Sequence, residues 1–437
     1  MENQIQNSIL EYTDDVIWNN IIQKSNNLET PSVFQLSETT SSYHTLKNSV
    51  LSVINNFMNT PKDLGIMKIY IDGGIISDPF RFLSDNPKNA DESIEAWKNR
   101  IQPDKTLVLK LDTCIALSDE LHYVLQEFLH PVLVSEGIPL GGIGVSLEFG
   151  DHKWSPDGLE EDLTQKKKFT INIGETNQTI YEWTPQKQQE VGGLIKKKGK
   201  VQNFTDYLMN HSEKYKVSQD QIAVMSNRGM YIIEHEGFYY KIRIHMSDLT
   251  KTELLQQMLF GIAAAAMSGK IRGRGANILP VYNIDQHDDF TQGILKDLQY
   301  SANDLNLTMR DLLKKSFNDM CYARRSNCGF LGFIRAREHS EVSDKFRDIS
   351  KDAKIKLKNA KFKIEYYSQG EETFLFMRGQ KTVVKQSKFV MEMIDLLNKG
   401  ESLMWHELKS TKYWKASAIE KLIQIAYKFR TISIIES

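Results

Sequence analysis

The sequence has little of several features that would assign a functional class directly. Cys114, Cys321 and Cys328 are its three cysteines among 437 residues, and their irregular spacing fits neither a zinc ribbon nor a disulfide framework. The start of the chain lacks the basic and apolar segments of a signal peptide. The most apolar stretch, residues 258–267, has ten residues where a membrane helix needs about 20. We therefore expect a cytoplasmic protein with no membrane segment, in which residues 258–267 form a buried helix.

Neither sign of charge is in excess, because 55 Lys and Arg residues stand against 56 Asp and Glu residues and the formal net charge is -1. Such a chain has no overall attraction to nucleic acid or to an anionic membrane. Local basic stretches occur at residues 166–168, 196–200 and 269–275, but none is followed by the Ser or Thr that a phosphate-binding Gly-Lys-Ser/Thr loop requires. We interpret them as solvated loops, which makes nucleic acid an unlikely partner.

The composition and the spacing of apolar residues change along the chain and predict four regions. Residues 1–65 are rich in Asn, Ser, Thr and Gln and predict an accessory N-terminal region. Residues 66–250 contain many short apolar runs separated by turn residues, as strands are. Residues 251–385 read as a helical, dimerising region, and residues 386–437 as a separate C-terminal domain.

A succession of short strands over residues 66–250 predicts a mainly β core, so the fold class is α+β overall. Helical spacing interrupts the strands at residues 90–101, at 118–137, where Ser118 is a predicted cap, and at 203–215. Pro131 is expected to kink or interrupt the second of these helices.

The C-terminal region predicts a helix, Gly400, a short helix, a longer helix and a final strand, which is the order of a winged helix. A DNA-reading winged helix needs a basic recognition helix with exposed side chains. Here the longer helix is expected to use its apolar residues for packing: Ile419, Leu422, Ile423, Ile425 and Ala426. A protein contact is therefore the better interpretation of this domain.

Three stretches resemble a known family: GIPLGG at 137–142, WSPDG at 154–158, and INIG with TIYEW at 171–183. Together they resemble the JmjC-like, cupin-fold 2-oxoglutarate oxygenases, in particular bacterial relatives of peptide and ribosomal-protein hydroxylases, over roughly residues 66–246. The resemblance implies a double-stranded β-helix barrel, Fe(II) and 2-oxoglutarate as cofactors, and a peptide or protein as substrate. It also implies a homodimer or a complex with a catalytic paralogue.

Active members hold iron with His-x-Asp and a second His on a late strand, because Fe(II) takes two imidazoles and a carboxylate on one face. This chain reads Glu160-Glu161-Asp162 at the first motif, and Met230 or Tyr231 at the second His. Gln178 stands where relatives carry a Lys that pairs with 2-oxoglutarate. The resemblance thus implies a degenerate metal site.

Two functions remain open from the sequence. The first is an oxygenase homologue that has lost its chemistry and binds a peptide or a protein partner. The second is an active oxygenase with unusual ligands, in which Glu160 and Asp162 are joined by His245, His235 or His152 around Fe(II) or Mn(II). Strand register decides which histidine faces the barrel interior.

In the second case we expect the cofactor 2-oxoglutarate to contact four residues: Gln178, Tyr181, Lys241 and Arg243. No catalytic residue is assigned. A simpler alternative for Glu160 is a solvated turn, or a salt bridge with Lys168, Lys241 or Arg243. In that alternative no metal is needed to balance its charge.

Overall fold

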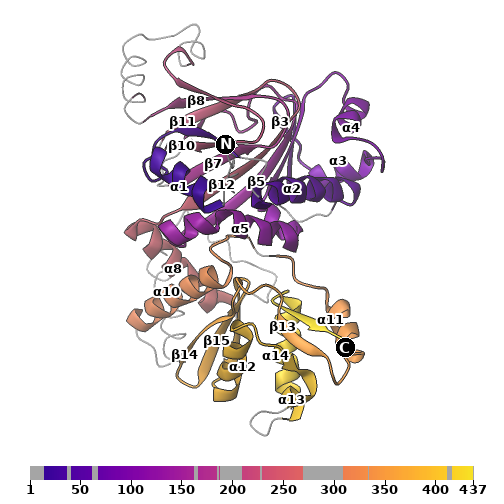
Figure 1. Ribbon diagram of the computed structural model, residues 1–437, viewed down its shortest axis with the longest axis vertical. Helices are drawn as coiled ribbons and strands as arrows, with labels where there is room; N and C mark the ends of the chain where they lie inside the picture. The colour runs from indigo at the N-terminus through magenta and orange to yellow at the C-terminus, as the bar shows by residue number, and fades with distance from the viewer. Residues whose placement is uncertain are drawn as a thin grey trace, which may run out of the picture.

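The computed structural model describes residues 14–36, 41–61, 67–161, 166–184, 187, 209–226, 229–268, 309–332, 334–410 and 416–436. Figure 1 shows two parts, an upper one with the large sheets and the N-terminal helices and a lower one that ends at the C-terminus. No helix of the described residues combines the length and the apolar character needed to cross a membrane.

The larger sheet of the upper part is antiparallel, and the described part of the chain gives it eight strands. Its centre is β12, which pairs with β5 on one side and β7 on the other, so that Arg243 lies between Ser146 and Thr170. In spatial order the strands are β1 (Ser32–Gln35), β10 (Gln221–Met225), β7 (Lys166–Asn172), β12 (Tyr239–Ser247), β5 (Gly142–Gly150), β4 (Leu107–Asp112), β2 (Met67–Ile71) and β3 (Gly74–Ile75).

A second antiparallel sheet lies against the first, because side chains from both sheets share one apolar cluster that includes Met225 and Ile233. In spatial order its described strands are β6 (Glu160–Glu161), β11 (Met230–His235), β8 (Gln178–Trp183) and β9 (Glu213–Val217). The strands β5 to β12 alternate between the two sheets along the chain, except that the consecutive strands β8 and β9 both belong to the second sheet. The predicted run of short strands is confirmed, whereas the helix predicted over 203–215 is wrong for Glu213–Tyr215 and otherwise falls mostly outside the described residues.

Helices cover the outer face of the larger sheet (Figure 1). These are α1 (Asp14–Lys24), α2 (Ser41–Asn59) and α5 (Asp119–Glu136). Trp18 of α1 is fully buried, donates a hydrogen bond to the Phe128 carbonyl oxygen (2.6 Å) and packs its ring edge-on against Phe169. These helices therefore build part of the main core.

The helix predicted over 118–137 is confirmed as α5, which Ser118 caps by accepting a hydrogen bond from the Leu121 amide. Pro131 lies inside this helix without ending it. Near the far edge of the sheet, Ser93 caps the helix predicted over 90–101, which begins only at Ile94. The short helices before β4 are α3 (Pro79–Asp85) and α4 (Ile94–Ile101), and the 3-10 helix η1 (Cys114–Leu117) follows β4 and contacts β5 and α5.

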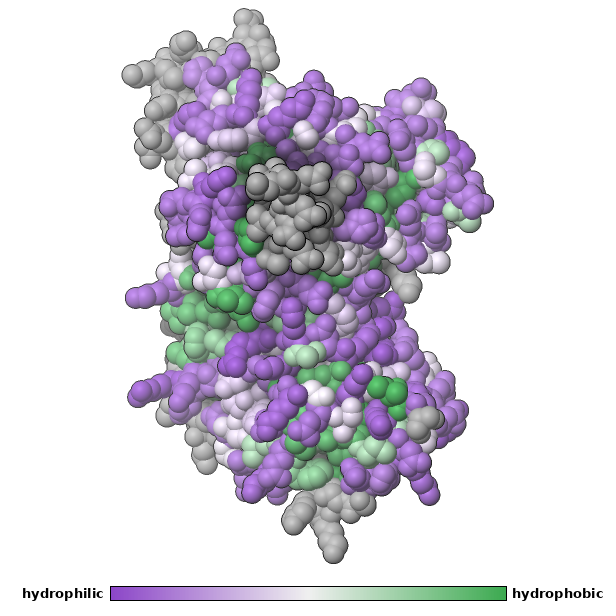
Figure 2. Space-filling view, viewed as in Figure 1, coloured by the Kyte–Doolittle hydropathy of each residue, from purple (hydrophilic) through white to green (hydrophobic). Residues whose placement is uncertain are grey.

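The middle of the chain contributes α8 (Lys251–Ser268), α10 (Met309–Ser326) and α11 (His339–Arg347). The apolar run 258–267 is helical as predicted, but the expectation of burial is wrong at its start, since Leu259 and Phe260 are exposed. Figure 2 shows an apolar area on this side of the molecule, over α8 and α10. Residues 251–385 are not helical throughout, because strands begin at Lys354.

The lower part holds two small antiparallel sheets and three further helices among its described residues. One sheet has the order β17 (Leu403–Met404), β13 (Lys354–Leu357), β18 (Ile432–Ile435), and the other the order β14 (Glu365–Gln369), β15 (Glu372–Met377), β16 (Gln380–Lys385). The helices are α12 (Lys388–Asn398), α13 (Trp405–Ser410) and α14 (Ala416–Lys428). The predicted element order of the C-terminal region is confirmed, and Ile419, Leu422, Ile423 and Ala426 are buried in its core as expected.

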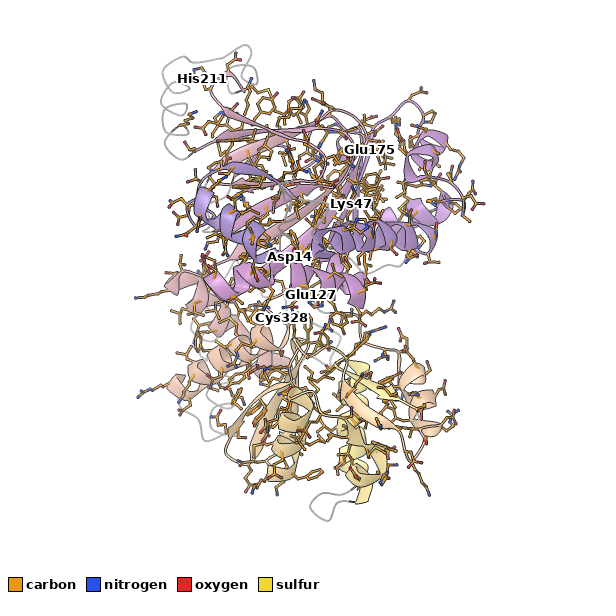
Figure 3. All side chains as sticks on the ribbon, viewed as in Figure 1. Asp14, Lys47, Glu127, Glu175, His211 and Cys328 are labelled. Atoms are coloured by element: carbon orange, nitrogen blue, oxygen red, sulfur yellow. The ribbon has the colours of Figure 1, made fainter. Side chains whose placement is uncertain are left out.

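A buried arginine joins the two parts. Arg378 lies in the tight turn between β15 and β16, is fully buried, and donates hydrogen bonds to the Tyr123 hydroxyl (2.9 Å) and to His122 Nδ1 (2.6 Å) of α5. Cys328 lies at the same junction (Figure 3), where its thiol contacts the Lys361 carbonyl oxygen. The lower part is therefore attached to the helix that covers the larger sheet.

Candidate functional site

The space between the two sheets is lined by polar side chains, and strand alternation explains why. On β12 the apolar residues Ile242, Ile244 and Met246 face the helices and join the main core. The intervening positions face the second sheet, and they carry long polar side chains: Lys241, Arg243 and His245. The same alternation on β5 turns Glu148 inward between Leu147 and Phe149.

Lys241 and Glu148 form an ion pair that is closed off from water. Lys241 Nζ lies 2.6 Å from Glu148 Oε1, and both side chains have 0% exposure. The ammonium also contacts Ser155 Oγ (3.1 Å), and Glu148 accepts a hydrogen bond from the Tyr239 hydroxyl (2.8 Å). Burial lowers the pKa of Lys241 below its usual 10.5, against the opposing effect of Glu148.

Arg243 lies one pleat further along β12 and reaches across to the second sheet. There β6 and β11 are paired so that Glu160 stands opposite Tyr231. The Arg243 guanidinium donates to the Glu160 carboxylate and to the Tyr231 hydroxyl, which in turn donates to Glu160 Oε2 (2.5 Å). The salt bridge predicted as the simpler alternative for Glu160 is confirmed, with Arg243 as its partner.

Asp157 extends this arrangement toward β4. Its carboxylate lies 3.5 Å from Arg243 Nη1, forms an ion pair with Lys110, and accepts a hydrogen bond from the Tyr70 hydroxyl (3.2 Å). Arg243 Nη1 is also 4.0 Å from Glu148 Oε2, so one guanidinium contacts three carboxylates.

These contacts form one connected set, which we call the interior ion-pair chain. Its interior members are three basic and three acidic side chains, whose formal charges sum to zero: Lys110, Lys241, Arg243, Glu148, Asp157 and Glu160. At the surface, Lys110 also lies 4.0 Å from Asp112, which pairs with Lys68. Each of the three acids also accepts a hydrogen bond from a tyrosine. Buried charges are tolerated when they are paired and hydrogen-bonded in this manner.

The carboxyl groups of Glu160 and Asp157 stay ionised. Burial alone would raise the pKa of Glu160, but the Arg243 guanidinium and the Tyr231 hydroxyl outweigh it and hold the pKa below 4.5. Burial likewise opposes ionisation of Asp157, yet Lys110 and Arg243 bring its pKa below 3.8. Both groups are therefore acceptors of charge-assisted hydrogen bonds at neutral pH.

The three candidate histidines occupy different positions. His235 is 4% exposed, stacks on the Tyr239 ring with centroids 3.5 Å apart, and places Nε2 3.3 Å from Lys241 Nζ. Burial and the neighbouring ammonium hold the pKa of His235 well below 6.5, so the imidazole is neutral. His152 bonds locally to the Trp154 backbone. His235 is therefore a buried, neutral side chain and does not lie at the surface.

His245 shares a cavity with Glu160. This cavity, of about 390 Å³, opens between the two sheets and is lined by Lys110, Lys166, Lys168, Tyr231 and Arg243 among others. The His245 ring lies over Gly144, where a Cβ would approach Cε1 to 2.0 Å. Glycine at position 144 therefore makes room for the imidazole on the cavity wall.

The four residues predicted to contact 2-oxoglutarate do not line one site. Lys241 and Arg243 belong to the interior ion-pair chain, and Gln178 is buried beside Asn172, to which its amide donates (3.0 Å). Tyr181 lies on the opposite face of β8 from Gln178, because the two are three residues apart, and its hydroxyl donates to Glu234. Tyr181 is thereby separated from the other three.

No three described His, Cys, Asp or Glu side chains come close enough to hold a metal ion together. In the motif Glu160-Glu161-Asp162, the structure describes the side chain of Glu160 only. Its carboxylate accepts hydrogen bonds from Arg243 and Tyr231. Asp162 lies outside the described residues, as does the side chain of Glu161. The described side chains, as arranged, do not fit the divalent ion that the family resemblance implies.

The sequence reasoning missed three members of the interior ion-pair chain: Lys110, Glu148 and Asp157. A signal was present for Glu148, because VSLEF alternates apolar and polar residues and so predicts one polar face. Asp157 was read only as part of the WSPDG motif. Its pairing with Lys110 of β4 depends on the fold around both residues.

No family model and no curated protein matches the sequence. Solved structures similar to the chain include the ribosomal oxygenase YcfD of Escherichia coli with cobalt and 2-oxoglutarate (TM-score 0.45) and with cobalt and succinic acid (TM-score 0.44). Each is 9% identical to this chain, and the match covers 96% of this chain and 98% of YcfD.

A Streptomyces albus protein, HEPD with Fe(II) and 2-hydroxyethylphosphonate, matches only 26% of this chain, with a TM-score of 0.18. At such identities and TM-scores no residue role is carried over from these proteins. YcfD, which matches nearly the whole chain, is a ribosomal oxygenase, the kind of protein that the sequence motifs of this chain resemble.

Proposed function

We propose that this chain is a JmjC- and cupin-like oxygenase homologue that has lost the usual Fe(II) and 2-oxoglutarate site and acts as a peptide- or protein-binding partner subunit. The observation that carries this proposal is the interior ion-pair chain. Its carboxylates already have cations and its cations already have carboxylates.

Charge balance is the physical reason. A divalent ion would need carboxylates whose negative charge is not yet compensated, and here Glu148, Asp157 and Glu160 each contact a basic side chain. A dicarboxylate such as 2-oxoglutarate would need free cations, whereas Lys241 and Arg243 are committed to those acids. Gln178 offers an amide in place of the missing charge. Binding either cofactor would therefore require breaking buried ion pairs, which is costly.

A binding role requires only a concave, preformed surface. The cavity that contains His245 and Lys166 meets this requirement, since it lies between the two sheets and is bordered by paired side chains whose positions are fixed. A peptide or protein partner is the ligand class that the family resemblance implies.

Several finer assignments belong to the same proposal. The alternation of strands between two antiparallel sheets supports a double-stranded β-helix, and the element order after Lys388 supports a winged helix used for protein contact. We assign the chain to the cytoplasm, as a homodimer or in a complex with a catalytic paralogue, and we propose neither a membrane nor a nucleic acid as its partner.

The proposal is tested by two assays on the full chain. Conversion of 2-oxoglutarate to succinate with Fe(II) and oxygen should not exceed that of the buffer control. Affinity purification with a paralogue from the same genome that carries intact His-x-Asp should recover a complex. Lys166→Glu, which inverts a charge on the cavity wall, should weaken this complex, while Lys388→Glu on exposed α12 should leave it unchanged. Turnover that Glu160→Gln abolishes would overturn the proposal.

A second candidate is an active metal-dependent oxygenase with Fe(II) or Mn(II) held by Glu160, Asp162 and His245. One observation favours it, namely that Glu160 and His245 line the same cavity. It requires Arg243 to release Glu160 when the ion binds. Turnover lost in both His245→Ala and Glu160→Gln would select this candidate over the first.

A further inference from the structure

The position of the Arg243 guanidinium leads to an inference about how the site is built. The family resemblance assigns the metal ligands to the Glu160 segment and to Met230 or Tyr231. The structure places Glu160 directly opposite Tyr231 in the β6–β11 pair, and the guanidinium contacts both side chains. The group found between the two ligand positions is thus an arginine.

The surroundings of the guanidinium are those of a cation site. Three carboxylates lie within 4.0 Å of its nitrogens: Glu148 of β5, Asp157 of the connection that follows, and Glu160 of β6. Clustered carboxylate oxygens are the ligands that hard divalent ions prefer. Among the described groups, Glu148 Oε2 and Glu160 Oε1 are buried and accept no hydrogen bond. Each of these two carboxylates therefore has one oxygen that could bind a metal ion.

We propose that Arg243 is a permanent cation of this site: its guanidinium stands in for a divalent ion by pairing with Glu160, by contacting Glu148 and Asp157, which also pair with Lys241 and Lys110, and by linking the two sheets. The inference rests on the proposed loss of the metal site and adds the group that replaced the metal. Because the cation is covalently attached to β12, the barrel interior is held together without any ion from solution. Removing the guanidinium leaves Glu160 without a basic partner, next to Asp157 and Glu148, which keep Lys110 and Lys241, and we expect a divalent ion to bind in the space that opens.

The test compares Mn(II) binding and thermal unfolding of the full chain with those of Arg243 variants. Wild type should show no Mn(II)-dependent change in Tm. Arg243→Ala should have a lower Tm, which Mn(II) should raise, because an ion at a hundred times its Kd raises the ratio of folded to unfolded protein about a hundredfold. Arg243→Gln, which keeps hydrogen-bonding groups but not the charge, is the milder second variant.

Three controls separate this effect from ordinary destabilisation. Arg243→Lys retains the charge and should not respond to Mn(II). Lys98→Ala removes another largely buried cation, whose partner is the single carboxylate of Asp151, and should lose stability without recovery by Mn(II). Adding Glu160→Gln to Arg243→Ala should abolish the gain.

Each outcome decides the inference. A gain of Mn(II) binding in the Arg243 variants with a silent wild type supports it. If neither wild type nor the folded Arg243 variants bind Mn(II), the inference is overturned and the proposed function stays intact. Variants that do not fold even with excess Mn(II) overturn it as well, since an ion then cannot replace the guanidinium. Mn(II) binding by wild type that Glu160→Gln abolishes overturns both proposals.

Discussion

The pair Lys241–Glu148 offers the most quantitative prediction, because both side chains have 0% exposure. Lys241→Met removes the cation but keeps the aliphatic length of the side chain. It leaves the Glu148 carboxylate with only the Tyr239 hydroxyl and the more distant Arg243. Breaking a buried pair by removing one partner costs about 3–5 kcal/mol. This is a large share of the roughly 5–15 kcal/mol that stabilises a typical native protein.

The double variant Lys241→Met/Glu148→Gln removes both charges and keeps an acceptor for Tyr239. It should cost about 1 kcal/mol, the size of one imperfect hydrogen bond. Urea unfolding followed by circular dichroism on wild type, both single variants and the double variant gives the free energy of unfolding for each. The reasoning is refuted if the double variant loses as much stability as the two single variants together, because the two charges would then not compensate each other.

Three further predictions concern other parts of the structure. The pKa of Glu160 is held below 4.5, so its contribution to stability is present above that pH and is lost as the pH falls; Glu160→Gln should show a shallower acid dependence than wild type in pH-dependent unfolding. Gly144→Ala should displace the His245 ring and cost about 1–3 kcal/mol, seen as a shifted imidazole NMR signal and a lower Tm; an unchanged signal would contradict the packing described. Arg378→Met should cost about 1–3 kcal/mol by leaving buried partners on α5 unpaired, and should speed limited proteolysis at the junction; equal proteolysis rates would count against that role.

The sequence was informative where a local pattern determines structure. Period-two alternation identified strands such as the one containing Arg243, and three- and four-residue spacing with a Ser118 cap identified α5. The packing residues of α14, such as Ile419, were also predictable, because one face of that helix is apolar. In each case the relevant interaction lies within one element or one face of it.

The site itself depends on contacts between residues far apart in the chain. Glu160 and Arg243 are 83 residues apart, and their pairing requires the register of β6 with β11 and of β12 with β7. Burial of His235 depends on the same tertiary arrangement, which single-strand patterns do not reveal. The exposure of Phe260 on α8 was missed because an apolar run was equated with burial. The strands after Lys354 went unrecognised within a region read as helical.

The central claim is that charges within the protein replace the metal and 2-oxoglutarate. Anaerobic calorimetry of the metal-free chain with Fe(II) and with Mn(II), each with and without 2-oxoglutarate, tests this claim most directly. The account predicts no binding tighter than a Kd of about 1 mM, roughly -4 kcal/mol, in any of the four titrations. Tight metal binding that Asp162→Ala abolishes would contradict it and would make this chain an oxygenase with unusual ligands.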